Sequence, residues 1–285
     1  MTKDEVVKVS CEKLKENNIP DFKISSECIL GVALKKKYED IPHGYDLTSK
    51  EYKRYMKLIS KRCKHIPLDK IVGYVDFYNL NIPYNKNVLS PRNETELLAE
   101  RVIKDIAKVK DKNLKVLDLC TGSGCLGLSI ARETSVSVTM SDISKKAIKF
   151  AKFNQKYNYV TGDIAYVLSD LFDNIIDKYD IIVCNPPYIK TSDLEMLEIE
   201  VRDFDPILAL DGGKDGLDFY RRIVKIAPQF LNTKNGLGVI YFEIGVGQSD
   251  SICKMLQKDF TDIQIIKDYS GIDRFIIAKK REKNA

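Results

Sequence analysis

Four consecutive residues, Asn185, Pro186, Pro187 and Tyr188, place hydrogen-bond acceptors and an aromatic ring at the end of an apolar run. Proline fixes the backbone φ angle and has no N–H group, so two prolines form a rigid corner that offers only carbonyl acceptors. The Asn185 side chain adds a further acceptor oxygen, and Tyr188 adds a flat face for stacking. This combination suits a planar NH2 group, which has two protons to donate and a π face.

Such an amide or amine nitrogen is a weak nucleophile because its lone pair is delocalised. Acceptance of both protons, by the Asn185 oxygen and the Pro186 carbonyl, would aim the nitrogen at an electrophile and stabilise its developing positive charge. Positioning would then supply most of the rate, so we predict Asn185, Pro186 and Tyr188 as catalytic residues. The structural alternative is a Pro-Pro turn that only caps a strand, and the flanking Asn185 and Tyr188 disfavour it.

A second group of residues could hold a cofactor. In the sequence DLCTGSGCLG, residues 118–127, Gly122 and Gly124 permit a tight turn from a strand into a helix. The N–H groups at the start of a helix can bind a polar ligand. Asp142 follows Asp118 by 24 residues, at the end of the next predicted strand, where a carboxylate can accept both hydroxyl protons of a ribose. Together these residues predict a nucleoside-containing cofactor.

Asp118 distinguishes between two such cofactors. A carboxylate beside the turn repels a pyrophosphate but attracts the ammonium group of an amino acid. We therefore expect S-adenosylmethionine rather than NAD, with S-adenosylhomocysteine as the product. Asp170 and Leu171, at the end of the third predicted strand, are expected near the adenine. The alternatives are a tight turn without a ligand and ordinary strand-end residues, and Asp118, Asp142 and the proline corner together disfavour the first.

Alternating strands and helices must position these residues. The sequence predicts strands at 113–119, 136–142, 162–170, 179–185 and 236–245, a helix at 247–260, and two closing strands at 263–269 and 273–280. Alternation of this kind predicts a parallel sheet with helices on both faces, and the short connection around Gly271 makes the closing pair antiparallel. This is the layout of a class I methyltransferase, a Rossmann-like α/β domain with a seven-stranded, mostly parallel sheet.

The N-terminal part has a different pattern. Residues 1–72 predict a small helical domain, in which Tyr52, Tyr55, Met56 and Ile59 form one apolar stripe. Residues 73–92 predict a β-hairpin linker, and residues 93–285 the methyltransferase domain. The helical domain holds 16 Lys/Arg against 11 Asp/Glu, which is the whole net charge of +5. This mild excess could face RNA, a ribosome or an acidic protein, although a solvated helix surface explains it more simply.

Composition excludes several other classes. The seven cysteines have no CxxC pair and there are only two histidines, so we expect neither a metal site nor a disulfide framework. No apolar run is long enough to cross a bilayer, and the N-terminus has no signal-peptide core. A cytoplasmic, monomeric protein that binds neither membranes nor nucleic acid stably is therefore expected.

The sequence resembles the release-factor glutamine methyltransferases (the PrmC/HemK family) along nearly its whole length. The matching stretches are SPRNETELL, DLCTGSGCLGLSIA, YDIIVCNPPYIK, VRDFDPILALDGGKDGLDFYRRI, FEIGVGQ and GIDRFIIA. NPPY alone indicates only an amino methyltransferase, whereas the FDPILALDGGKDGLDFYR block is far more specific. The resemblance implies methylation of the side-chain amide nitrogen of the glutamine in the GGQ motif of class 1 peptide chain release factors, which would be the protein partners.

The resemblance also implies roles for individual residues. Cofactor contacts carry over to Cys120, Thr121, Gly122, Ser123, Gly124, Asp142, Leu171 and Asn185, and glutamine contacts to Asn185, Pro186, Pro187 and Tyr188. Arg92 and Glu94 match the linker motif and could place the substrate loop, or could simply form a salt-bridged helix start. Cys120 stands where the family usually has glycine and Leu171 where an aromatic is common, so altered cofactor affinity is expected there.

Two rival functions remain open from the sequence. An adenine-N6 methyltransferase would hold an adenine amine in the same corner, but duplex-modifying enzymes need a base-flipping apparatus. Here the catalytic part is balanced in charge, with no large recognition domain after it. The second rival is a binding module that has kept the fold and lost turnover, which the intact NPPY, Asp118 and Asp142 disfavour.

Overall fold

The computed structural model describes residues 1–110, 113–233 and 237–282. The first residue of the predicted strand 236–245 and the last three of the predicted domain 93–285 lie outside the described residues. The chain divides into two compact units. Met1–Val75 and Glu198–Phe204 form the first, and Asp76–Leu197 and Asp205–Ala285 form the second.

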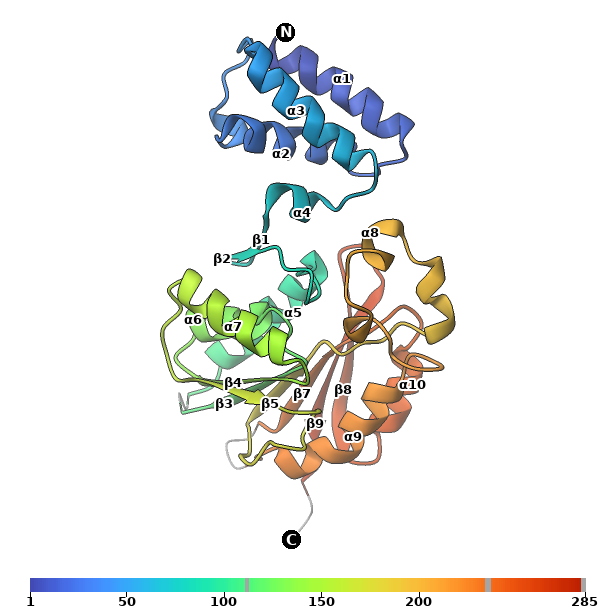
Figure 1. The fold of residues 1–285 in the computed structure, drawn as a ribbon. Coiled ribbons are helices and arrows are strands. Elements are labelled where there is room, and N and C mark those ends of the chain that lie inside the picture. The colour runs from blue at the N-terminus through green and yellow to red at the C-terminus, as the bar shows by residue number, and fades with distance from the viewer. Residues whose placement is uncertain (111–112, 234–236, 283–285) are drawn as a thin grey trace. The chain divides into compact units, whose positions relative to one another are not determined.

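The first unit is helical, as its apolar periodicity predicts (Figure 1). It contains α1 (Lys3–Glu16), α2 (Phe22–Leu34), the 3-10 helix η1 (Tyr38–Asp40), α3 (Ser49–Arg62), α4 (Leu68–Val72) and α8 (Ile199–Arg202). Thr2 and Thr48 cap α1 and α3 with complete capping boxes. Each threonine hydroxyl accepts a hydrogen bond from the backbone N–H three residues on, and the glutamate side chain at that position accepts one from the threonine backbone N–H. Tyr55 and Ile59 of the predicted stripe are fully buried, and Tyr52 and Met56 pack against the same core.

A buried arginine ties the segment Glu198–Phe204 to the helices of this unit. Arg62, at the end of α3, is only 2% exposed. Its guanidinium donates to Asp21 Oδ1 at 2.7 Å, to Glu200 Oε1 at 2.6 Å and to Ser25 Oγ at 2.9 Å. The charge is thereby paired and its donors are used, which is the condition for burying an arginine without a large cost.

The hairpin and the helix before the second unit's sheet also form where expected. Strands β1 (Tyr74–Phe77) and β2 (Leu80–Pro83) make a two-stranded sheet, and α5 (Asn93–Ala107) follows. The side chains of Phe77, Leu80 and Ile82 are buried in the larger core of the second unit. The hairpin therefore contributes to that core as well as connecting the chain.

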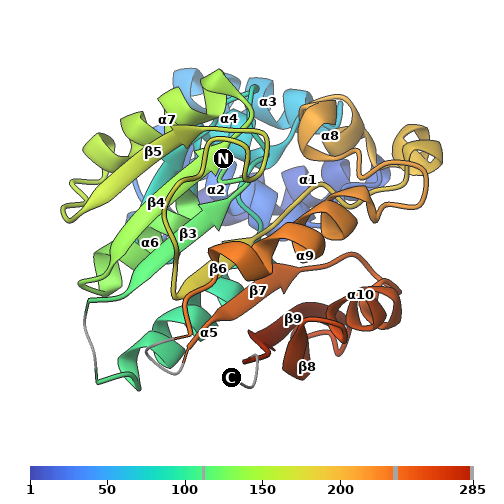
Figure 2. The same ribbon diagram turned by 90° about the horizontal axis from the view of Figure 1, so that it is seen from below.

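The second unit contains the predicted seven-stranded sheet, with strand order β5-β4-β3-β6-β7-β9-β8 (Figure 2). The strands are β3 (Lys115–Leu119), β4 (Ser137–Asp142), β5 (Ile164–Leu168), β6 (Ile181–Cys184), β7 (Val239–Glu243), β8 (Phe260–Lys267) and β9 (Asp273–Lys280). The first five pair in parallel, and β9 pairs antiparallel with both β7 and β8. This confirms the class I methyltransferase fold with its antiparallel C-terminal hairpin.

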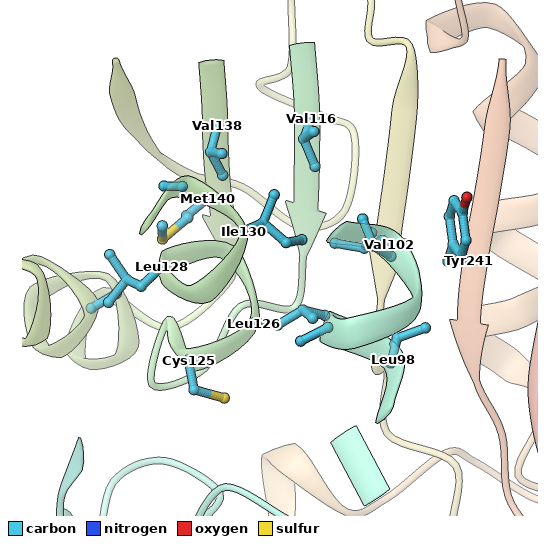
Figure 3. Close-up of a cluster of buried hydrophobic side chains, with 14 of the residues drawn as sticks. Leu98, Val102, Val116, Cys125, Leu126, Leu128, Ile130, Val138, Met140 and Tyr241 are labelled. Carbon is cyan, nitrogen blue, oxygen red and sulfur yellow. The ribbon is translucent and has the colours of Figure 1, made fainter. Parts of the chain in front are cut away.

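Helices cover both faces of the sheet. α5, α6 (Cys125–Glu133) and α7 (Lys145–Tyr157) pack on one face, and α9 (Asp218–Phe230) and α10 (Ser249–Leu256) on the other. Figure 3 draws part of the first face. There the helix side chains of Leu98, Val102, Leu126 and Ile130 pack over the strand side chains of Val116, Val138 and Met140. The core on each face fixes the carboxyl ends of the strands, where the predicted site residues lie.

Two details of the second unit differ from the sequence pattern. The predicted helix 247–260 ends earlier, at Leu256 of α10. Phe260 is instead the first residue of β8, where its side chain is fully buried and its backbone pairs with Lys280 of β9. The stretch after the proline corner forms short helices that the pattern did not predict: η2 (Thr191–Met196) and η3 (Ile207–Ala209), with α8 between them in the chain. Within the described residues, no helix is both long and apolar enough to span a membrane.

Candidate active site

A pocket in the second unit opens beyond the carboxyl ends of β3, β4, β5 and β6, where open α/β sheets bind ligands. It gathers most of the residues predicted from the sequence: Arg92, Asp118, Cys120, Thr121, Gly122, Ser123, Asp142, Asp170, Leu171, Asn185 and Pro187. These residues come from five separate stretches of the chain. The fold thus brings the glycine turn, the two acids and the proline corner to one cavity.

Asp118 is the most deeply buried acid of the pocket, with 1% of its surface exposed. Its Oδ2 accepts the Thr121 hydroxyl at 2.5 Å and the Gly127 N–H at 3.0 Å. Burial raises the pKa of Asp118 to about 7, and these two hydrogen bonds oppose the rise. The carboxyl group therefore sits where a cationic partner would favour its ionised form.

The turn after β3 explains why glycine suits its first position. Cys120 has a φ of 58°, in the left-handed region that residues with a β-carbon rarely adopt. Thr121 N donates to Ser141 O at 3.0 Å, and Gly124 N donates back to Thr121 O at 2.8 Å. A β-carbon at Gly124 would lie 2.9 Å from Cβ of Ala151, so the helix that starts there packs too closely for any larger residue.

Asp142 ends β4 and holds the neighbouring loops together. Its Oδ2 accepts the Gly122 N–H at 2.9 Å, and its Oδ1 accepts the Ser144 N–H at 2.8 Å. Burial raises its pKa, and these two backbone hydrogen bonds oppose that shift. Each carboxylate oxygen has a second lone pair, so both can still accept a hydroxyl proton from a ligand. Ser144 also caps α7, as predicted, by accepting from Ala147 N.

The two residues predicted near an adenine differ in their surroundings. Leu171 is 6% exposed and packs into the core beneath α9, and its φ is 49°. Asp170 is partly exposed and pairs with Arg222, whose Nη2 lies 2.8 Å from Asp170 Oδ1. Both line the pocket. Their role toward a cofactor stays a prediction.

The proline corner follows β6. Asn185 lines the pocket and forms a side-chain hydrogen bond to the protein behind it. Asn185 Nδ2 donates to Thr95 Oγ1 at 3.3 Å. The Asn185 side chain also lies close enough to Glu243 to oppose the rise that burial causes in the pKa of that carboxyl group. The Thr95 hydroxyl donates to Glu243 Oε2 at 2.7 Å. Thr95 lies on α5 and Glu243 ends β7, so residues from three elements meet behind Asn185.

Tyr188 does not line the pocket, because its backbone and ring fit between glycines of two later segments. A β-carbon on Gly212 would lie 2.7 Å from Tyr188 Cα, and one on Gly245 would lie 3.0 Å from Tyr188 Cδ2. Gln248 Nε2 donates to the Tyr188 carbonyl at 3.0 Å. Burial raises the pKa of Tyr188 to about 12. The specific segments LDGGKDG and FEIGVGQ therefore fix the position of the corner.

Arg92 and Glu94 lie apart from each other. Arg92 lines the pocket and pairs with Asp205, with Nη2 and Oδ2 2.5 Å apart. Glu94 is exposed in the first turn of α5, beside a different pocket. The two alternatives given by the sequence, placement of a substrate loop and a salt-bridged helix start, both remain for Arg92.

Sequence reasoning missed several residues at the site. Phe219 and Arg222 of α9 and Leu208 of η3 line the pocket. Thr95 accepts a hydrogen bond from Asn185 and donates one to Glu243. One signal was present for Glu243, because an acid in the apolar stretch VIYFEIG at the end of a predicted central strand is unusual. Thr95 carries no such signal.

The chain is similar in sequence to known proteins along most of its length. Residues 5–73 match the family model described as the PrmC N-terminal domain, and residues 92–201 match the one described as the methyltransferase small domain. Over 238 residues the chain is 37% identical to the release factor glutamine methyltransferase of Thermodesulfovibrio yellowstonii, which covers 82% of this chain and 84% of that protein. Over 283 residues it is 36% identical to the protein of that name in Clostridium acetobutylicum, which covers 97% of each.

A solved structure supports the fold independently. The methyltransferase from Pyrococcus furiosus superimposes with a TM-score of 0.52 and 15% sequence identity, and the match covers 71% of this chain and 90% of that one. At this identity the similarity establishes the α/β methyltransferase fold and no more than the fold.

Proposed function

The chain belongs to the release factor glutamine methyltransferase family, and on that basis we propose that it methylates the side-chain amide nitrogen of the GGQ glutamine in class 1 release factors, with S-adenosylmethionine as donor. It is an S-adenosylmethionine-dependent methyltransferase. The single observation that carries the substrate assignment is the full-length similarity to the relative from Clostridium acetobutylicum. The proposal includes a monomeric enzyme without a stable nucleic-acid complex.

The residues of the pocket fit this cofactor better than a dinucleotide. Two carboxyl groups, Asp118 and Asp142, line one cavity beside the turn at Gly122. The buried Asp118 suits an ammonium group and would repel a pyrophosphate, and the free lone pairs of Asp142 suit a pair of ribose hydroxyls. When bound, S-adenosylmethionine supplies a methyl group activated by a sulfonium. Asp170 and Leu171 would then border its adenine.

The proline corner would act through hydrogen bonds. Asn185 Oδ1 and the Pro186 carbonyl would accept hydrogen bonds from the two N–H groups of the glutamine amide and aim its nitrogen into the pocket. After methyl transfer, the nitrogen would release one proton to solvent. The same two oxygens would stabilise the positive charge that develops on this nitrogen. Tyr188, held by Gln248 and by the nearby glycines, would keep the corner in position, so that orientation supplies most of the rate.

The test of the substrate is a comparison of acceptors. The purified protein is incubated with labelled S-adenosylmethionine and a class 1 release factor, the same factor with its GGQ glutamine changed to alanine, or total tRNA or DNA. We expect label on the first acceptor alone. Label on nucleic acid alone would mean that the corner holds an adenine amine, and an absence of label with cofactor still bound would indicate a binding module.

We further propose that the helical domain, residues 1–72, recognises the body of the release factor away from the glutamine. Its support is the excess of basic residues and the exposure of Lys53 and Lys57 on α3. Removal of the domain is a poor test, because Glu200 would lose Arg62. Charge reversal on the intact chain avoids this problem.

The experiment compares Lys53→Glu/Lys57→Glu with Lys149→Glu/Lys156→Glu, a matched pair of exposed lysines on α7. If α3 attracts the factor, the first variant raises KM for the whole release factor and leaves KM for a short GGQ peptide unchanged, because surface charge acts on association with a charged partner. The α7 variant should change neither. Equal effects of the α3 variant on factor and peptide would refute this role.

A further inference from the structure

Asn185 can serve as an acceptor only if its amide group is oriented with the oxygen toward the pocket. An asparagine amide has one oxygen and one NH2 group of nearly the same shape, and the two orientations differ only in their hydrogen bonds. In the reverse orientation, NH2 would face the glutamine NH2, and two donors would meet. The proposed function therefore requires something that selects between the two orientations.

The groups behind Asn185 make that selection by their chemistry. The Glu243 side chain, 2% exposed, is an acceptor when it is ionised. It accepts the Thr95 hydroxyl proton at 2.7 Å, which leaves Thr95 Oγ1 with lone pairs only toward Asn185. Thr95 Oγ1 thus accepts from the Asn185 NH2 group, and the Glu243 carboxylate that orients this hydroxyl is a further acceptor on the same side. The Asn185 oxygen is left to face the pocket.

The packing shows that this arrangement is built into the fold. Thr95 is 4% exposed on the first turn of α5, and Glu243 is the last residue of β7. The Tyr220 hydroxyl of α9 donates to the Glu243 carbonyl at 2.7 Å, so the backbone of the acid is fixed as well. A buried acid is costly unless its neighbours satisfy it. Burial raises the pKa of Glu243 to about 7, and the Thr95 hydroxyl and the Arg274 charge oppose that rise.

We propose that Thr95 and Glu243 are positioning residues, which orient the Asn185 amide so that its oxygen accepts a hydrogen bond from the substrate N–H group. This inference rests on the proposed function. It adds two residues, from α5 and β7, to the machinery that the NPPY corner alone would suggest. Neither residue touches the substrate, since both act through Asn185.

Three variants separate orientation from packing. Thr95→Val keeps the shape and removes the hydroxyl, Thr95→Ser keeps the hydroxyl, and Glu243→Gln replaces one acceptor oxygen with a donor. The NH2 group of a glutamine at 243 would attract the Asn185 oxygen inward and favour the reverse orientation. Thr134→Val is the matched control, because the Thr134 hydroxyl also bonds within the protein, to Ile130 O at 2.6 Å, but outside this group.

The first readout is turnover. We expect Thr95→Val and Glu243→Gln to lower kcat by about 10- to 100-fold, as misplacement of a reacting group does, with the Kd for S-adenosylmethionine and the KM for a GGQ peptide little changed. Thr95→Ser should keep most of the wild-type kcat. The double variant Thr95→Val/Glu243→Gln should have a kcat no lower than that of Glu243→Gln alone, because both residues act through one hydrogen-bonded group. Wild-type kcat in both single variants, or an equal loss in Thr134→Val, would overturn the proposal.

The second readout does not depend on activity. In protein with labelled asparagine, the side-chain NH2 protons of Asn185, assigned with an Asn185→Asp variant, should exchange slowly with water in the wild type and in Thr95→Ser. They should exchange fast in Thr95→Val and Glu243→Gln. Fast exchange in the wild type would overturn the inference. Slow exchange in a wild type that transfers no methyl group would support the orientation and count against the proposed function instead.

Discussion

The position of the proline corner should depend on a single missing β-carbon at Gly212. In the variant Gly212→Ala, the added atom would lie 2.7 Å from Tyr188 Cα and 2.9 Å from the Pro187 carbonyl oxygen. Both are backbone atoms, so no side-chain rotation can relieve the contact. An ordinary contact begins near 3.4 Å, so the corner must move by about 3.4 − 2.7 = 0.7 Å.

A shift of this size should be felt mainly in turnover. Misplacement of a reacting group by about 1 Å costs up to about 100-fold in rate, so we expect kcat to fall by about 10- to 100-fold. Overpacking of this kind costs about 1–3 kcal/mol of stability, which should leave the protein folded. The turn at residues 118–127 is on another strand, so the Kd for S-adenosylmethionine should change little.

Two further glycines provide graded controls. Gly245→Ala meets the side chains of Gln248 at 2.9 Å and of Tyr188 at 3.0 Å, which can rotate away, so its effect on kcat should be smaller. Gly247→Ala meets nothing within 4 Å and carries only the strain of its φ of 76°. It should lose stability without losing kcat.

The assay is methyl transfer to a GGQ peptide, with cofactor binding by calorimetry and stability by urea unfolding measured on the same samples. The predicted order of kcat is wild type and Gly247→Ala, then Gly245→Ala, then Gly212→Ala. A folded Gly212→Ala variant with wild-type kcat would refute the conclusion that the position of the corner controls the rate. A loss in Gly247→Ala as large as in Gly212→Ala would show that stability alone explains the series.

Three other variants test the site and the helical unit. Burial raises the pKa of Asp118 to about 7, and the ammonium of the cofactor prefers the ionised carboxylate. Cofactor affinity should therefore fall by up to about tenfold per pH unit below that pKa and level off above it. Titration calorimetry should find no such pH dependence in Asp118→Asn, and a dependence that persists there would assign it to another group. Cys120→Gly should raise the free energy of unfolding by about 1 kcal/mol, since glycine adopts the left-handed backbone conformation at position 120 without strain. A lower free energy of unfolding in urea would contradict this. Arg62→Met should lower that energy by about 2–4 kcal/mol, because it removes the buried guanidinium from the partly buried carboxylates of Asp21 and Glu200. A change below about 1 kcal/mol would mean that water replaces the guanidinium.

Local sequence patterns predicted the parts of the molecule that depend on neighbours in the chain. The strand and helix alternation gave the sheet and its antiparallel closing pair, and the Ser144 cap has a local signature. Asp118, Asp142 and Asn185 could be predicted for a related reason. Asp118 and Asp142 lie at the carboxyl ends of β3 and β4, and Asn185 directly follows β6. The carboxyl ends of parallel strands share one edge of the sheet.

The residues that the sequence did not reveal act across long separations. Thr95 and Glu243 are 148 positions apart, and only the packing of α5 against β7 brings them together. Neither spacing nor composition predicts that contact. The same holds for the glycine at 212, whose small size is explained by the backbone of Pro187 and Tyr188 beside it. The helix boundary at Leu256 was missed because the pairing of Phe260 with β9 overrides helical periodicity there.

The central claim is that the Asn185 corner methylates a glutamine amide, and one measurement tests it most directly. A class 1 release factor is treated with the wild-type protein or with Asn185→Ala, and the GGQ peptide is sequenced by mass spectrometry while cofactor binding is measured in parallel. The account predicts one added methyl group on the glutamine side chain with the wild type, and none with Asn185→Ala, although that variant still binds S-adenosylmethionine. Methylation of the same glutamine by Asn185→Ala at the wild-type rate would contradict it.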